Sequence, residues 1–460
     1  MKRLLTILSL LVLALVIAHA ATARWAGIEA ERQIRAMLEQ IDRETVLQVR
    51  DLEYDRGWWS SRLRYTLEAR HDGGIPALDV NDHIRHGPLI SGNGLRPGLG
   101  ALDTRARVSG SDRDAFAASG LVALDGRIAS NYRLHELTLP YVNAEEGSLR
   151  ITLGDGEGTL VFDPADNRIV HQGRLSHLLV EERDGDGRIQ LDGIRLDQNT
   201  AEEAPGLWAG ALGVNIDRLR LWEADGDTME LAGIRLEADV TPEGETFDGT
   251  LSLAAERVSS GALLLGPGRV SLSLERIGID AWSRTTQLME EIRVAGDDET
   301  VTATLLLHGP ELLRQFLGHG PRIRLGEASL EVPDEGRLDA SARINYPPDT
   351  ELNMFNPLAA VNALEAELEF RVPVHLVRYW RRQRIRAELD SEQAQRDSPL
   401  APEAYNAELE ARLDEAMHEL AGPWFVRTAD GEIRSHIRLE NGVVSANGNH
   451  IGSLVALLLP

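Results

Sequence analysis

The sequence contains no cysteine, and this absence removes several classes of chemistry. Disulfides, thiolate nucleophiles and cysteine-ligated zinc sites are all excluded. A chain without thiols fits an oxidising compartment, where stray thiols are a hazard. Aromatic residues make up only 5% of the 460 residues. Small and aliphatic side chains must therefore carry the packing of the core.

Positive charge is also scarce, because 48 basic residues face 73 acidic ones and the formal net charge is −25. Broad nucleic-acid binding needs a basic surface, so we expect no nucleic-acid partner. The sequence also lacks a phosphate loop, a dinucleotide fingerprint and, around Ser60-Ser61, the Gly-x-Ser-x-Gly pattern of a nucleophile elbow. We therefore predict no cofactor, no catalytic residue and no metal ligand.

One hydrophobic run is long enough to cross a bilayer. It extends from Leu4 to Ala23 behind Lys2 and Arg3, and as a helix it would span roughly 30 Å. The preceding positive charges would keep the N-terminus in the cytoplasm. A retained single-span anchor in the inner membrane is one interpretation. A cleaved signal peptide is the other, because Ala18-His19-Ala20 and Ala21-Thr22-Ala23 resemble cleavage sites. Both place the bulk of the chain in the periplasm.

Most of the chain, from Val46 to Arg371, alternates between apolar and polar residues in short runs separated by Gly, Asp, Asn and Pro. Examples are Arg188 to Leu191 and Val270 to Leu274. Period-two alternation bounded by turn formers is typical of half-buried antiparallel strands. We predict a mainly β protein, of the β-rich α+β class. It would have a long curved antiparallel sheet of many short strands, an N-terminal membrane helix and a C-terminal helical insertion.

One internal echo stands out in this region. Leu191 to Asp197 recurs as Leu231 to Glu237, an offset of 40 residues. The echo indicates a duplicated strand unit, although convergent strand patterning explains it as well.

The predicted organisation has five parts. They are a membrane anchor or uncleaved signal segment at 1–23, an amphipathic stalk helix at 24–45, a β-rich periplasmic domain at 46–373, a helical segment at 374–422, and C-terminal strands completing the sheet at 423–460. Within them we expect a short helix at Glu311 to Leu317, helices at His375 to Gln395 and Tyr405 to Leu420, a hairpin turn at Asn441-Gly442, and an edge strand or core plug at Leu454 to Leu459.

Several polar clusters suggest sites but have simpler explanations. His83 and His86, near Asp79 and Asp82, have metal-like spacing, yet nothing supplies the matched partners that zinc needs. His308-Gly309-Pro310 is interpreted as a helix cap. Three acidic clusters resemble calcium loops but lack the full twelve-residue pattern, so we interpret them as turns. These are Asp184 to Gly187, Asp225 to Asp227, and Asp297-Asp298.

The helix at His375 to Gln395 carries a row of arginines that is unusual in so acidic a protein. Arg378, Arg381 and Arg382 are candidates for contact with a membrane or a ligand, since basic residues attract anionic lipid head groups. Pairing with the acidic helix that follows explains the same residues. Trp58 and Trp59 are the other candidate contacts, with core packing as the alternative.

The order of several segments resembles the YdgA-like family of bacterial envelope proteins, a family of unknown function. The matching segments are the N-terminal hydrophobic run, Tyr54 to Ser61, His86 to Leu89, Val372-Pro373-Val374, and Gly442 to Gly448. The resemblance implies a protein anchored in the inner membrane of a Gram-negative bacterium, facing the periplasm, with no established activity. In style the chain is also similar to AsmA-type proteins, whose long sheets form apolar grooves for lipid.

We therefore expect a non-enzymatic envelope-maintenance protein that binds lipid or another apolar ligand, or scaffolds envelope proteins, along one sheet face. The alternative is an envelope hydrolase that uses paired carboxylates, which would require a cleft with two close carboxylates of shifted pKa. A purely structural interaction protein, with a closed dry sandwich, is the third hypothesis.

Overall fold

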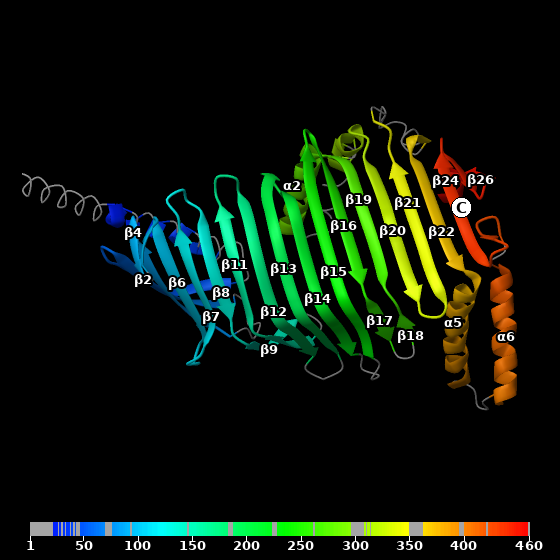
Figure 1. Cartoon of the computed structure of the whole chain (residues 1–460), viewed down its shortest axis with the longest axis horizontal. Coiled ribbons are helices and arrows are strands. Elements are labelled where there is room, and N and C mark those ends of the chain that lie inside the picture. The colour runs from blue at the N-terminus through cyan, green and yellow to red at the C-terminus, as the bar shows by residue number, and fades with distance from the viewer. Residues whose placement is uncertain are drawn as a thin grey trace, which may run out of the picture. The chain divides into compact units, whose positions relative to one another are not determined.

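The computed structural model confirms a mainly β protein built on antiparallel strands (Figure 1). It describes residues 22–458 except 26, 29–30, 33, 37, 40–41, 43–46, 70–75, 93, 145–146, 183–186, 223–227, 261–262, 296–307, 310, 313, 349–361, 395–399 and 420–421. The chain divides into two compact units. Unit 1 comprises residues 1–201 and 211–230, and unit 2 comprises residues 202–210 and 231–460.

Unit 1 carries an open antiparallel sheet in which neighbouring strands follow the order β1–β2–β3–β6–β7–β8–β11–β12–β13. β10 pairs with both β9 and β12, and β4 forms a separate hairpin with β5. The strands that lie in this unit or begin there are β1 (Leu47–Arg56), β2 (Ser60–Ala69), β3 (Leu78–His86), β4 (Leu89–Gly92), β5 (Gly94–Pro97), β6 (Gly100–Val108), β7 (Asp114–Val122), β8 (Ile128–Leu134), β9 (Leu137–Ala144), β10 (Gly147–Leu153), β11 (Gly156–Asp163), β12 (Arg168–Glu182) and β13 (Arg188–Ala204).

Unit 2 carries an antiparallel sheet with the order β15–β16–β19–β20–β21–β22–β24–β25–β26. The strands are β14 (Leu207–Trp222), of which only residues 207–210 belong to this unit, β15 (Thr228–Glu243), which enters this unit at Leu231, β16 (Thr246–Ala255), β17 (Arg257–Ser260), β18 (Leu263–Leu265), β19 (Gly268–Gly278), β20 (Arg322–Val332), β21 (Gly336–Asn345), β22 (Glu365–Pro373), β23 (Val426–Arg427), β24 (Glu432–Glu440), β25 (Val443–Ala446) and β26 (Asn449–Ser453). The helices are α2 (Ile279–Ala295), α5 (Val374–Ala394), α6 (Pro402–Glu419) and α7 (Leu454–Leu458).

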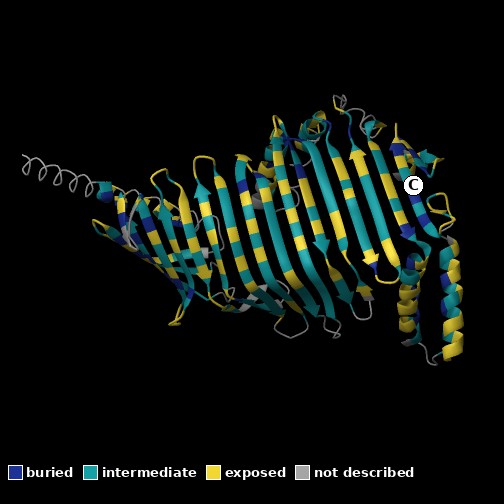
Figure 2. Cartoon of the chain, in the orientation of Figure 1, coloured by how far each residue is buried: buried dark blue, intermediate teal, exposed yellow. Residues whose placement is uncertain are grey.

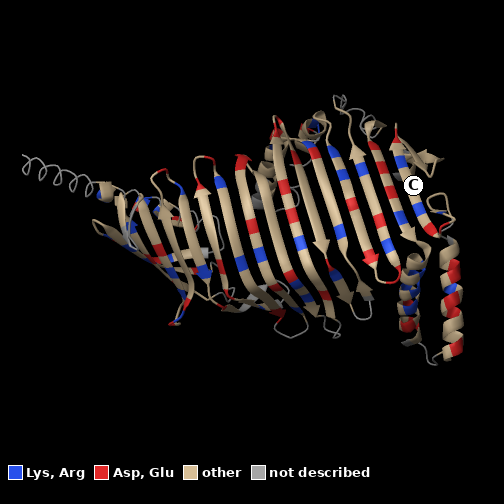
Figure 3. Ribbon diagram, viewed as in Figure 1, with Lys and Arg blue, Asp and Glu red and all other residues tan. Residues whose placement is uncertain are grey.

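Each sheet has two chemically different faces, as the alternation in the sequence predicts. Side chains along a strand point in turn to opposite faces. In Figures 2 and 3 the strands accordingly show alternating bands of exposure and of charge. In unit 2, Leu236, Ala238 and Val240 of β15 share one face, and the exposed Glu237 and Asp239 share the other.

The N-terminal region is described only in part. All but the last two residues of the predicted anchor, Leu4 to Ala23, lie outside the described residues. Among the described residues, no helix is both long and apolar enough to cross a membrane. The described positions between 22 and 42 are helical, as predicted for the amphipathic segment. This helix contacts the unit 1 sheet, because Glu31 forms an ion pair with Arg56 of β1 at 3.0 Å.

The repeated heptapeptide adopts the same local structure twice. Gly193 and Gly233 both have positive φ, at 64° and 62°. The arginine two positions later binds a carboxylate of a following segment in each copy: Arg195 pairs with Asp217 at 2.9 Å, and Arg235 pairs with Glu256 at 2.8 Å. A Cβ at either glycine would collide with that carboxylate side chain. The echo therefore encodes a recurring glycine–arginine–carboxylate arrangement, and not only a strand rhythm.

The helical insertion folds as predicted. α5 and α6 pack through a core of Ile385, Leu389, Leu409 and Leu413. The N-terminal end of α5 packs on the unit 2 sheet through Leu376, which is fully buried. The described residues of the predicted helix at Glu311 to Leu317 are helical too.

The C-terminal prediction is correct in part. β24 and β25 form a hairpin whose turn residues, Asn441 and Gly442, both have positive φ as a type I′ turn requires. The edge strand predicted at Leu454 to Leu459 is wrong, because Leu454–Leu458 forms the short helix α7. An unbroken apolar run of this length does not distinguish a strand from a helical turn. The three acidic clusters interpreted as turns lie outside the described residues, apart from Gly187.

Candidate functional site

A broad apolar surface lies on one face of the unit 2 sheet, where β16, β19, β20, β21, β22 and β24 place aliphatic residues in register. We call this surface the open apolar face. One row across it consists of Leu251, Leu272, Leu325, Ala342, Leu368 and Ile437. The rows on either side consist of Leu253, Val270, Ala328, Ala340 and Phe370, and of Leu274, Ile323, Ile344, Ala366 and Leu439.

This face is exposed to a degree that is unusual for so many neighbouring aliphatic side chains. Leu253 is 46% exposed, Val270 43% and Leu251 42%. Ile323, Ile344 and Leu368 are also exposed. Contiguous apolar patches of this kind mark binding surfaces more often than isolated exposed residues do.

Both ends of the open apolar face adjoin packed clusters. At one end, Phe247 and Ile277 form a core with Leu207, and Trp282 of α2 meets the Phe247 ring edge-on at a centroid distance of 5.4 Å. At the other end, Val332 and Ile433 pack with Val372 and Leu376. The sheet is therefore covered at its two margins, while the middle of this face stays accessible.

The opposite face of the same sheet is charged and highly ion-paired. Glu367 lies at its centre: it accepts hydrogen bonds from His436 at 2.8 Å, from Arg343 at 2.8 Å and from Arg438 at 3.1 Å. Glu369 lies close enough for Glu367, Glu369 and His436 to surround a cation. Two guanidinium groups already neutralise Glu367, so this cluster is better suited to holding strands together than to holding a metal.

The same cluster brings two carboxylates, those of Glu367 and Glu369, close together, as the hydrolase hypothesis requires. A general acid needs a carboxyl group that stays protonated near neutral pH. The hydrogen bond from His436 and the contacts with Arg438 hold the pKa of Glu367 below its ordinary value. Glu367 is thus ionised at neutral pH and cannot be the proton donor that glycoside hydrolysis requires.

The two histidines of the predicted metal-like spacing point to opposite faces of β3. The buried His86 ring is hydrogen-bonded through Nδ1 to the Trp58 carbonyl at 3.3 Å and through Nε2 to Ser61 Oγ at 3.0 Å. Burial lowers the pKa of His86, so the ring is neutral and accepts the Ser61 proton. Ser61 is only 1% exposed. This serine–histidine pair therefore secures the hairpin and has no access to a substrate.

Asp82 lies on the same covered face as His86 and is 8% exposed. Its Oδ1 atom has no hydrogen-bond partner among the described residues. Burial raises the pKa of Asp82 above the ordinary value of 3.8, although a hydrogen bond with Thr104 opposes the shift. The folded chain therefore binds this proton more tightly than the unfolded chain, and Asp82 reduces the stability of unit 1 as pH rises above that ordinary value.

We expect Asp82→Asn to raise the free energy of unfolding by about 1–3 kcal/mol at neutral pH, because it removes a buried, incompletely bonded charge. The gain should shrink as the pH falls towards the ordinary pKa, where Asp82 is protonated in both states. Chemical denaturation at several pH values measures both effects. Asp103→Asn is the matched control, because Asp103 lies on the exposed face, paired with Arg85 at 2.9 Å. Equal stabilities of wild type and Asp82→Asn at neutral pH would contradict this account.

The predicted contact residues do not gather in one site. Trp58 and Trp59 lie in the turn between β1 and β2 of unit 1 and are 62% and 49% exposed. In unit 2, Arg378 pairs with Glu410 at 3.1 Å and with Asp414 at 3.2 Å, and Arg382 also pairs with Glu410. The alternative interpretation, that these arginines bind the acidic helix, is therefore confirmed for both. Arg381, on the same helix, is half-buried.

Sequence reasoning did not locate the open apolar face. The alternation showed that every strand has an apolar side, and this signal is identical for covered and uncovered strands. The one clue was the low aromatic content, which leaves few large side chains to cover a sheet of this size.

Comparison with known proteins establishes the family. Residues 1–452 match the family model described as "Bacterial protein of unknown function (DUF945)", so the chain belongs to that family. The search of curated proteins found no match. The search of solved structures found none either.

Proposed function

We propose that this member of the DUF945 family is a non-enzymatic envelope protein that binds the acyl chains of lipid along the open apolar face. The observation that carries the proposal is the set of in-register aliphatic rows, six of whose residues (Leu251, Leu253, Val270, Ile323, Ile344 and Leu368) are 38–46% exposed. Burial of apolar surface contributes about 25 cal/mol per Å², so occupation of these rows by hydrocarbon is favourable.

The chemistry of the face favours acyl chains over a protein partner. Its residues are almost all Leu, Val, Ile and Ala, and Phe370 is the aromatic exception. Protein interfaces are enriched in aromatic residues, Met and Arg instead. The six strands extend across roughly 24 Å at the usual strand spacing. One acyl chain, about half of the ~30 Å hydrocarbon core of a bilayer, fits along a row.

The cellular setting belongs to the same proposal. The run from Leu4 to Ala23 would anchor the chain in the inner membrane and direct the remainder to the periplasm of a Gram-negative bacterium. That address would place the open apolar face near its ligand. The YdgA-like relationship and the likeness in style to AsmA-type proteins, both expected from the sequence alone, are part of this proposal and would agree with an envelope role.

Native mass spectrometry of the full-length protein, released from mild detergent, tests the proposal. We expect wild type to retain phospholipid-sized adducts. The double variant Leu251→Lys, Leu253→Lys should lose at least about tenfold of that occupancy, because each ammonium group would have to be desolvated beside the hydrocarbon. Both leucines are over 40% exposed, so the variant should fold.

Thr250→Lys is the matched control. Thr250 is exposed, directly precedes Leu251 on the opposite face of β16, and faces Asp239 of β15. It adds one of the same charges without touching the open apolar face, and the membrane segment is unchanged in all three proteins. The proposal would be wrong if wild type, control and double variant showed equal lipid occupancy. It would also be wrong if none of the three proteins retained lipid after incubation with phospholipid vesicles.

A further inference from the structure

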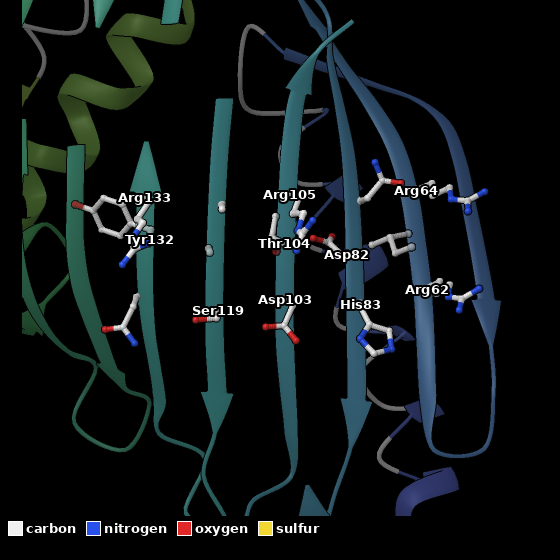
Figure 4. Close-up of a pocket in the computed structure, with 15 residues that line it drawn as sticks. Arg62, Arg64, Asp82, His83, Asp103, Thr104, Arg105, Ser119, Tyr132 and Arg133 are labelled. Atoms are coloured by element: carbon white, nitrogen blue, oxygen red, sulfur yellow. The ribbon is translucent and has the colours of Figure 1, made fainter. Parts of the chain in front are cut away.

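A hollow lies in unit 1, on the charged face of its sheet. Five adjacent strands, β2, β3, β6, β7 and β8, line a space of about 830 Å³ (Figure 4). Each strand contributes three consecutive residues. The exposed side chains at the first and third positions form the walls, and the middle positions belong to the covered face. We call this space the arginine hollow, after Arg62, Arg64, Arg105 and Arg133.

The strand register sets the spacing of three of these arginines. Arg64 lies opposite Asn81, Asn81 opposite Arg105, Arg105 opposite Ala117, and Ala117 opposite Arg133. The arginines thus occupy alternate strands of one row, on the same face. At the usual strand separation they are about 10 Å apart. Polar side chains that can donate hydrogen bonds, Asn81, Ser119 and Asn131, lie among them.

Three of the four guanidinium groups of the hollow form no ion pair with the residues that the structure describes, and the fourth forms only a long one. Among the described residues, Arg62, Arg64 and Arg133 form no ion pair, and the nearest carboxylate oxygen to Arg105 belongs to Asp114 at 3.9 Å. Asp114 is itself bound by Arg107. Of the two acidic residues that line the hollow, Asp103 is paired with Arg85 and Asp82 points to the covered face.

The next stretch of the same row provides an internal comparison. Beyond Arg133 the row continues with Glu157, Arg174 and Arg195. There Arg174 binds Glu157 at 2.7 Å and Arg195 binds Asp217 at 2.9 Å. Most arginines that the structure describes form ion pairs with carboxylates, as Arg174 and Arg195 do, so three arginines without an ion pair in one hollow stand out.

We infer that the arginine hollow binds a ligand carrying several phosphate groups. Guanidinium groups bind phosphate oxygens in bidentate fashion, and Lys2 is the only lysine in the chain, so the positive charge of the folded units is all of this kind. A concave surface of one charge sign also concentrates ligands of the opposite sign. This site is independent of the open apolar face, which lies in unit 2.

The test uses full-length protein in non-ionic detergent and two soluble probes, pyrophosphate and tripolyphosphate, followed by isothermal titration calorimetry. Neither probe has an acyl chain, so its binding does not depend on the open apolar face. We expect wild type to bind tripolyphosphate more tightly than pyrophosphate, and the affinity to fall as salt is added. The triple variant Arg64→Gln, Arg105→Gln, Arg133→Gln should lose at least tenfold in affinity.

Arg174→Gln, Arg195→Gln is the matched control, because it removes two arginines of the same row that are already paired; its affinity should stay within about twofold of wild type. The Leu251→Lys, Leu253→Lys variant should bind the probes as wild type does, so that a failure of either site is seen separately.

Vesicles of phosphatidylglycerol and of phosphatidylcholine identify the source of the phosphate. Arginine-dependent binding to phosphatidylglycerol vesicles, with or without binding of tripolyphosphate, would assign a lipid head group. Binding of tripolyphosphate alone would assign a soluble ligand. The inference is overturned if neither tripolyphosphate nor phosphatidylglycerol vesicles bind at low salt, if the triple variant binds as wild type does, or if poly-glutamate competes as well as tripolyphosphate.

Discussion

Replacing Gly87 by alanine should reduce the free energy of unfolding of unit 1 by more than about 4 kcal/mol, an exceptional loss that is expected because the added methyl group meets rigid backbone. Gly87 donates a hydrogen bond to the Leu99 carbonyl at 2.7 Å, and Gly98 donates one to the Pro88 carbonyl at 2.9 Å. These bonds draw two backbone segments together, and a Cβ on Gly87 would overlap the Gly98 carbonyl oxygen and lie 2.8 Å from the Leu99 carbonyl oxygen. Neither segment can move without breaking the bonds.

The measurement is hydrogen exchange of the β3 and β6 amides, together with chemical denaturation. Gly120→Ala is the control, since the atom nearest to its added methyl group is Ser130 Cβ at 3.4 Å. That variant should differ from wild type by less than about 1 kcal/mol. Wild-type protection of β3 and β6 in Gly87→Ala would show that the two segments can separate at little cost.

Replacing Leu376 by alanine should cost about 2–5 kcal/mol of the stability of unit 2, the range for a fully buried leucine. Leu376 is 0% exposed and packs with Val332, Val372 and Ile433. The cavity left by the substitution would lie between α5 and the sheet. Protection from hydrogen exchange should fall first in α5, β22 and β24.

Two control variants separate packing from helix propensity. Leu376→Met conserves volume and should cost less than about 1.5 kcal/mol. Gln383→Ala lies on the exposed side of α5 and should leave stability nearly unchanged. If the amides of α5, β22 and β24 exchanged no faster in Leu376→Ala than in Gln383→Ala, the contact between α5 and the sheet would contribute little to the stability of unit 2.

The role of the α5 arginines shows where sequence reasoning reached its limit. Opposite charges on consecutive helices favoured pairing, and Arg378 and Arg382 do bind the acidic helix. Three arginines without an ion pair among the described residues lie instead in short strands of unit 1, at Arg62, Arg64 and Arg133. In the sequence these residues are separated from one another by up to 71 positions and look like ordinary exposed strand positions.

The sequence by itself determined the fold class, the helices of the C-terminal insertion and the hairpin at Asn441-Gly442, because these depend on local periodicity and turn chemistry. It also revealed the repeat of Leu191 to Asp197, because the same Gly-Ile-Arg-Leu segment recurs 40 residues later. In the structure both glycines of the repeat have positive φ.

Only the tertiary structure decided which apolar strand faces are covered and which arginines meet. An apolar face is covered only where another element packs on it. At one end of the unit 2 sheet α5 does so through Leu376, whereas none of the described residues covers Leu251 and Leu253. Strand register, in turn, brings Arg64, Arg105 and Arg133 into one row. Both properties arise from contacts between residues far apart in the chain, and the period of a single strand carries no record of its neighbours.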